Sequence, residues 1–86
     1  MPIELEIVSP EKLILSKSVE MVVIPADEGE MGILVEHAPC IVLLRAGDVR
    51  IYAGDTVIET IPVTGGFAEV TPHRVTVLAT LGQHRQ

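Results

Sequence analysis

Aromatic residues are almost absent from this sequence, which has 86 residues with one Tyr, one Phe and no Trp. A site that stacks sugar rings or bases on aromatic faces is therefore disfavoured. The interior is left to Val, Ile and Leu, whose side chains fit a pleated sheet. The hydrophobic content of 48% supplies enough of them for the core of one domain.

Cysteine and positive charge are also scarce. The single cysteine, Cys40, cannot form an intramolecular disulfide, and its neighbours Pro39 and Ile41 predict a small buried hydrophobe rather than a nucleophile. Lys and Arg total 6 against 12 acidic residues, which gives a formal charge of −6 with no basic stripe. This balance argues against nucleic acid as a partner.

No apolar run approaches the roughly 18 residues of a transmembrane helix. The opening residues, MPIELEIV, are acidic where a signal peptide begins with basic residues. We therefore expect a soluble, unexported chain without direct membrane insertion, whose association with a membrane would come through a partner.

Helical periodicity is missing as well, and a period of two takes its place. In residues 3–7, Ile, Leu and Ile alternate with two Glu, the pattern of a half-buried strand. Further short apolar runs, each bounded by turn residues, cover 13–15, 20–24, 32–35, 41–45, 49–53, 56–63, 67–71 and 74–79. We predict an all-β domain at 1–81, an antiparallel β-sandwich or flattened barrel of eight or nine short strands, followed by a polar tail at 82–86.

Several short segments predict where the chain reverses. Ala-Gly-Asp occurs at 46–48 and again at 53–55, and both are predicted hairpin turns, as is Thr-Pro-His at 71–73. Gly65 and Gly66 can supply positive φ. We interpret them as a bulge or tight turn rather than a phosphate cradle, because a strand and not a helix follows them.

Recognisable constellations for catalysis or metal binding are missing too. Asp27, Glu28 and Glu30 do not match the ligand spacing of an EF-hand, and no paired Cys or His predicts zinc. We expect no enzyme, metal or cofactor. The candidate nucleophiles are Ser9, Ser16, Ser18 and Cys40, and the candidate bases are His37, His73 and His84. None of them lies in a recognisable catalytic motif.

The segment at 27–39, DEGEMGILVEHAP, is the most informative part of the chain. It surrounds Met31 with three carboxylates and flanks it with Gly29 and Gly32. An acidic turn with an apolar residue at its tip is a candidate docking site. The alternative is a solvated hairpin whose Met31 folds back onto the sheet.

Five separated motifs together resemble those of a known protein family. They are EGEMGIL at 28–34, HAP at 37–39, GDV at 47–49, GGFAEV at 65–70 and RVTVLA at 74–79. In this order and spacing, residues 3–80 resemble the N-terminal β domain of the epsilon subunit of F-type ATP synthases. The opening LEIVSPEKLILSKSVEMV also resembles the family's first two strands and the segment that leads to the third.

The resemblance implies an antiparallel β-sandwich of about ten short strands. It also implies a non-catalytic rotor subunit of the central stalk, which binds the gamma subunit and rests on the loops of the c ring. Such a subunit couples proton translocation through the ring to ATP synthesis in the catalytic head. It would lie at the cytoplasmic face of the bacterial inner membrane, as a peripheral part of the complex.

The resemblance also implies roles for particular residues. Glu30 would pair with a basic or amide group of the ring, and Met31 would fill an adjacent apolar gap. The full implied set is Glu28, Glu30 and Met31 for the c ring, Ser9, His37, Ala38, Pro39 and Val42 for gamma, and Gly29, Gly32, Gly65 and Gly66 for shaping turns.

The sequence departs from the common family pattern at its end. It stops at Gln86, where typical members continue into a two-helix hairpin that inhibits ATP hydrolysis and in some members binds ATP. Neither ATP binding nor that switch is carried over. Cys40 and Val42 also stand where larger aliphatic or polar residues are often seen.

Two other hypotheses stay open at this point. The first is a free-standing β-sandwich module that binds a protein or a small ligand, which would need an apolar pocket with convergent polar groups. The second is a hydrolase built on His37 and a serine.

Overall fold

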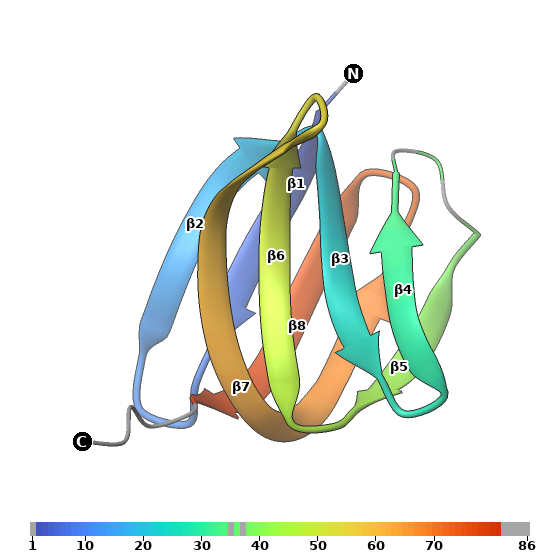
Figure 1. The fold of residues 1–86 in the computed structure, drawn as a ribbon. Coiled ribbons are helices and arrows are strands. Elements are labelled where there is room, and N and C mark those ends of the chain that lie inside the picture. The colour runs from blue at the N-terminus through green and yellow to red at the C-terminus, as the bar shows by residue number, and fades with distance from the viewer. Residues whose placement is uncertain (1, 35, 37, 82–86) are drawn as a thin grey trace.

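The structure, a computed structural model, describes residues 2–34, 36 and 38–81, in which the chain forms eight strands and no helix (Figure 1). The strands are β1 (Ile3–Val8), β2 (Leu13–Val19), β3 (Met21–Ala26), β4 (Gly29–Ile33), β5 (Cys40–Leu44), β6 (Gly47–Ala53), β7 (Thr56–Val70) and β8 (Arg74–Leu81). The predicted tail at 82–86, with His84, lies outside the described residues, as do Val35 and His37.

The eight strands form one continuous sheet that folds into two layers, because both layers share β7. The second half of β7 pairs with β5 and β8, and β1 and β2 lie beyond β8. The first half pairs with β6, which leads to β3 and β4. Figure 1 shows β7 curving at one end of the molecule as it passes from one layer to the other. The predicted all-β sandwich or flattened barrel is confirmed.

One strand boundary and one pairing differ from the prediction. The nine segments predicted from the sequence pattern become eight strands, because 56–63 and 67–71, predicted as separate strands, are joined in β7. Eight strands are also fewer than the about ten that the resemblance implies. The register with β8 shifts between Val63 and Gly65, and both Gly65 (φ +150°) and Gly66 (φ +127°) have positive φ. The pair therefore forms the predicted bulge without ending the strand. In addition, β1 and β8 pair in parallel, whereas the prediction was antiparallel throughout.

The predicted turns have mixed outcomes. The turn at 53–55 joins the paired strands β6 and β7, with Gly54 at φ +61°, and the turn at 71–73 joins β7 and β8. Both predictions are confirmed. The hairpin predicted at 46–48 is wrong, because β5 and β6 each pair with β7 and β3 and not with each other. The chain turns a corner between the layers there.

The core lies between the two layers and is built from aliphatic side chains. The alternation in β1 buries Ile3, Leu5 and Ile7, which are at most 1% exposed. Burying one such side chain completely contributes about 1.5 to 3 kcal/mol. Cys40 is half-buried and packs against this core.

The two open sides of the flattened barrel differ in the contacts that connect the layers. On one side, the Lys17 ammonium of β2 lies 3.0 Å from the Glu59 carboxylate of β7 and bridges the layers. On the other side, β5 pairs with β3 only at Ala26 and Leu44, and no ion pair joins β4 to β5 among the described residues. A seam therefore remains between β4 and β5.

Candidate protein-docking surfaces

A row of apolar side chains crosses the outer face of the layer formed by β2, β1, β8, β7 and β5. The strand register places Val8 between Leu13 and Leu78, and it places Phe67 between Leu78 and Leu43. Directly opposite residues on paired strands have Cβ atoms about 4.5 to 5.5 Å apart. These five side chains therefore form a continuous band, which we call the apolar row.

Three of the five side chains of the apolar row are exposed, and Val8 and Leu78 are half-buried. Leu43 is 65% exposed, Leu13 55% and Phe67 40%, and Ile41, two residues from Leu43 on the same face of β5, is 62% exposed. A single exposed hydrophobe is ordinary, but a contiguous band marks an interaction surface. The row is therefore the main candidate for binding another protein.

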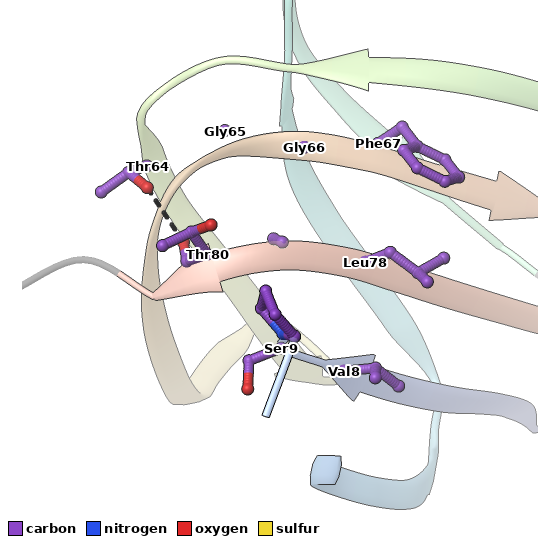
Figure 2. A pocket seen from close by; sticks show the side chains of 10 residues that line it. Val8, Ser9, Thr64, Gly65, Gly66, Phe67, Leu78 and Thr80 are labelled. Carbon is purple, nitrogen blue, oxygen red and sulfur yellow. Dashed lines mark hydrogen bonds between the residues drawn. The ribbon is translucent and has the colours of Figure 1, made fainter. Parts of the chain in front are cut away.

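A hollow of about 380 Å³ lies beside the inner part of the apolar row (Figure 2). Its walls come from Val8, Phe67 and Leu78 of the row and from Gly65 and Gly66, which have no side chains to occupy it. A side chain projecting from a partner could enter this hollow while the row packs against its neighbours.

Polar groups at the hollow are engaged within the chain. The Ser9 hydroxyl lies 3.2 Å from the Lys12 carbonyl and accepts the Lys12 N–H at 3.3 Å, so it holds the turn between β1 and β2. The Thr64 hydroxyl donates to the Thr80 carbonyl at 3.2 Å, as Figure 2 shows. A small-molecule site needs convergent free polar groups, so this hollow fits an apolar protein side chain better.

The acidic segment forms a tight turn and an edge strand instead of a long loop. Ala26 pairs with Gly29, so only Asp27 and Glu28 lie at the tip, and β4 begins at Gly29 rather than at the predicted residue 32. Met31 is half-buried inside β4 and packs against the core. The expectation of an apolar tip is wrong, and the alternative, that Met31 folds back onto the sheet, is confirmed.

A second hollow, of about 340 Å³, lies at the seam between β4 and β5. Its apolar lining includes Met31, Ile41 and Leu43, and its acidic rim is made by Asp27 and Glu28. We call it the acidic groove. Leu43 belongs to both this groove and the apolar row, so the two surfaces meet on β5.

Glu30 does not line the acidic groove. Its Oε1 accepts a 2.6 Å hydrogen bond from Nη2 of Arg50 on β6. This bond holds the pKa of Glu30 below its ordinary value of 4.5, and the positive charges of Arg50 and Arg45 act in the same direction. The same bond, with a second that Arg50 donates to the Tyr52 hydroxyl oxygen, raises the pKa of Arg50.

The stability contributed by the Glu30–Arg50 pair should disappear in acid. Glu30→Gln should lower Tm slightly at neutral pH, because the pair is largely exposed. Since the folded pKa of Glu30 lies below its unfolded value, the contribution is complete above about pH 4.5 and is lost as the pH falls through the lowered pKa. Thermal melts of both proteins from about pH 7 to about pH 3 should converge.

Glu69→Gln is a suitable control, because no hydrogen bond or ion pair of the Glu69 side chain occurs among the described residues. Its Tm should follow wild type at every pH. A Glu30→Gln deficit that stays constant down to about pH 3 would contradict the ion-pair account.

The other residues singled out from the sequence are dispersed. Ala38 and Pro39 are exposed in the segment before β5, while His37 is outside the described residues. Val42 is half-buried, packs against the core and lines the acidic groove, whereas Ser9 lines the other hollow. Gly29 has φ +136° at the acidic turn, but Gly32 lies inside β4 without positive φ, so it shapes no turn.

The apolar row itself is what sequence reasoning missed. Its signal is present in β5 and β8, where CIVLL and RVTVLATL are apolar at successive positions instead of alternating. A strand that is apolar on both faces predicts a covered outer face. The hairpin turn at 71–73 would then have placed Phe67 near Leu78.

Neither a metal-ligating cluster nor a membrane-spanning helix is found in the described part of the chain. Within residues 2–34, 36 and 38–81, no group of three or more His, Cys, Asp or Glu could hold a metal ion. No helix there is long and apolar enough to cross a membrane. What the arrangement offers is one apolar band and one acidic groove for protein contacts.

Comparison with known proteins gives a consistent result. Residues 2–81 match the family described as ATP synthase, Delta/Epsilon chain, beta-sandwich domain. The ATP synthase epsilon chain of Granulibacter bethesdensis is 63% identical over 75 residues, which are 87% of this chain and 56% of the relative. That of Rhodospirillum rubrum is 50% identical over 76 residues, 88% of this chain and 57% of the relative. The chain thus spans somewhat more than half the length of these relatives.

Two solved assemblies contain chains of similar fold. In the OSCP/F1/c-ring part of the Euglena gracilis mitochondrial ATP synthase, one chain matches with a TM-score of 0.81 and 28% identity, over 91% of this chain and 50% of that chain. In the central stalk/c-ring part of the Tetrahymena thermophila enzyme, the TM-score is 0.73 at 15% identity, over 93% and 64%. The second likeness concerns the fold alone.

Proposed function

Since this chain belongs to the family of ATP synthase delta and epsilon chain β-sandwich domains, we propose that it is a non-catalytic part of the rotor of an ATP synthase. In this role it binds the gamma subunit of the central stalk and rests on the c ring. It couples proton translocation through the ring to ATP synthesis, as a peripheral component at the cytoplasmic face of a bacterial membrane.

The observation that carries the proposal is the apolar row with the hollow beside it. Leu13, Val8, Leu78, Phe67 and Leu43 offer a band across five strands that only another protein surface can cover. We assign the gamma subunit to this band. Ser9, one of the residues predicted to face gamma, lies at the hollow and holds its rim in place.

We assign the ring to the acidic groove. Of the residues predicted to face the ring, Glu28 and Met31 line this groove, and Glu30 follows on the same edge strand. Ala38, Pro39 and His37 belong to the neighbouring segment before β5, and their contacts with gamma remain predictions. Because the groove and the apolar row share Leu43, one rigid domain could contact both partners at once.

Stiffness is the property that such a coupling subunit needs. Torque passes through a body only if the body does not shear, and here every strand is hydrogen-bonded to at least one neighbour around a dry aliphatic core. The shared strand β7 ties the two layers together covalently. No catalytic group is required for this task.

A binding measurement tests the proposal. The domain is titrated into purified gamma subunit and, separately, into detergent-solubilised c ring, with calorimetry as the readout. We expect saturable binding to gamma with Kd of about 1 µM or tighter. Absence of binding to gamma at about 100 µM would overturn the proposed function.

A further inference from the structure

We propose that Lys17 prevents the free edge of β2 from pairing with the same edge of a second copy of this chain, so that β2 is a strand-pairing surface blocked by one side chain. The inference does not depend on the assignment of gamma and the c ring. It comes from the position of Lys17 in the sheet, from its contact with Glu59, and from the way the other free edges are built.

The first argument is the face of the sheet on which Lys17 lies. In the strand register, Lys17 is opposite Leu5 of β1, which is 0% exposed and belongs to the core. Opposite residues on paired strands share a face of the sheet. Lys17 therefore occupies an inward position, in the same series as Leu15 and Val19, where the alternation of β2 would place an apolar side chain. An inward-pointing charge is one way in which proteins protect an edge strand.

The second argument is the contact that Lys17 makes. Its ammonium lies 3.0 Å from the carboxylate of Glu59, which is opposite the buried Ile51 of β6 and so also lies at an inward position. The pair closes the open side between β2 and the first half of β7 (Figure 1). Of the three ion pairs found among the described residues, it alone joins the two layers. An exposed ion pair stabilises a fold less than a buried aliphatic side chain does, so stability does not account for a lysine at this position.

The third argument is that β2 has no other protection along its edge. It pairs with β1 and with no other strand in the described part of the chain. Its seven residues, LILSKSV, include neither proline nor glycine, and Lys17 is the only charged residue among them. An unpaired edge of this length and composition is a template for another strand.

The other strands with a largely unpaired edge are poorer templates. β4 and β5 have five residues each, and β4 contains two glycines. The first half of β7 contains Pro62, which has no N–H, and its register with β6 shifts between Ile51 and Tyr52. Short strands, prolines and bulges all disfavour pairing with another chain. The edge of β2 is therefore the one at which a single side chain decides the outcome.

The partner that fits this edge is a second copy of the chain. An edge strand can pair antiparallel with itself across a two-fold axis, which requires no other sequence. In full overlap of two β2 strands, Lys17 would be opposite Leu15 of the second copy, and the two Lys17 residues would be diagonal neighbours about 7 to 8 Å apart. Two like charges, each drawn away from Glu59, oppose this pairing.

Variants of the full chain test the proposal. Lys17→Val removes the charge and places a β-branched side chain at the inward position. It also makes a chain of formal charge −6 more acidic, so general charge repulsion acts against the expected association. Ser16→Val is the matched control, because it adds the same side chain at the neighbouring exposed position of β2 and keeps Lys17. Lys17→Arg keeps the positive charge.

Sedimentation velocity measures association, hydrogen exchange of backbone amides locates it, and Tm verifies folding. Lys17→Val should dimerise with a Kd of about 50 µM or tighter. The amides of β2 should then exchange more slowly at high than at low protein concentration. Wild type, Ser16→Val and Lys17→Arg should stay monomeric up to about 500 µM, which corresponds to association at least about tenfold weaker.

Three results would overturn the inference. The first is a folded Lys17→Val protein that is monomeric at about 500 µM. The second is a Lys17→Val dimer in which the exchange of the β2 amides is unchanged, and the third is association of Ser16→Val as strong as that of Lys17→Val. Lys17→Thr, a second uncharged β-branched variant, should also dimerise, and it replaces Lys17→Val if that protein does not fold. None of these measurements involves gamma or the ring, so their outcome is separate from that of the proposed function.

Discussion

Gly66→Ala is expected to destabilise the domain by about 3 to 5 kcal/mol, a large part of the 5 to 15 kcal/mol typical of a folded domain. Gly66 has φ +127°, where an L side chain is strained by about 1 to 3 kcal/mol. Its Cβ would also collide with the Leu78 carbonyl oxygen and lie 2.8 Å from Ala79 Cα. Backbone atoms of β8 cannot rotate aside, so overpacking adds about 1 to 3 kcal/mol.

Thermal and urea unfolding would measure this effect, and Tm should fall by about 15 °C or more. Gly29→Ala is the matched control. Gly29 has a similar φ of +136°, but an added Cβ there would meet nothing within 4 Å. The Gly29→Ala variant should lose only the stability that corresponds to backbone strain, about 1 to 3 kcal/mol. Equal Tm values for the Gly66 variant and wild type would refute the close contact between β7 and β8.

The local sequence pattern predicted most of the fold, because most strands and turns are determined by residues that are close together in the sequence. The alternation of Ile3, Leu5 and Ile7 identifies the inward face of β1, and the turns at 53–55 and 71–73 fix two hairpins. Residues 56–63 and 67–71 were predicted as two strands because Gly65 and Gly66 look like an end of a strand in sequence. Only contact with β8 on one side and β5 on the other shows that they continue it.

Pairings between segments that are distant in the sequence could not be predicted from local sequence pattern. The parallel pairing of β1 with β8 joins the two ends of the chain, and no turn residue signals it. The resemblance to the family supplied the architecture, including the sandwich, without specifying this pairing. The same limit applies to the layer change at 46–48, where the turn chemistry is present but the strands on either side do not pair.

In the candidate site, too, the sequence predicted the local features but not the contacts between distant strands. The acidic turn was visible in the sequence, and so was the possibility that Met31 packs on the sheet. The partner of Glu30 was not, because Arg50 lies 20 residues away on another strand. The apolar row depends on the register of five strands together, so it becomes visible only when they are assembled.

Phe67→Asp should weaken binding to the gamma subunit by about 100-fold, because interface residues at the centre of an apolar band dominate affinity. Phe67 lies in the middle of the apolar row and also lines the hollow, so a carboxylate there would be desolvated against apolar atoms without a partner. It is 40% exposed, so the variant should fold with a Tm near wild type. Titration calorimetry with gamma measures the loss.

Two further variants make the result specific. Ile58→Asp changes a side chain that is similarly exposed, at 54%, but lies near the β6–β7 turn and outside the row, and it should bind gamma as wild type does. Leu43 belongs to the row and to the acidic groove, so Leu43→Asp should weaken binding to gamma and to the c ring, whereas Phe67→Asp should affect gamma alone. If Ile58→Asp weakened gamma binding as much as Phe67→Asp, the gamma subunit would have to cover the other layer. If Leu43→Asp bound the c ring as tightly as wild type does, the proposal that the gamma-binding and ring-binding surfaces meet on β5 would be wrong.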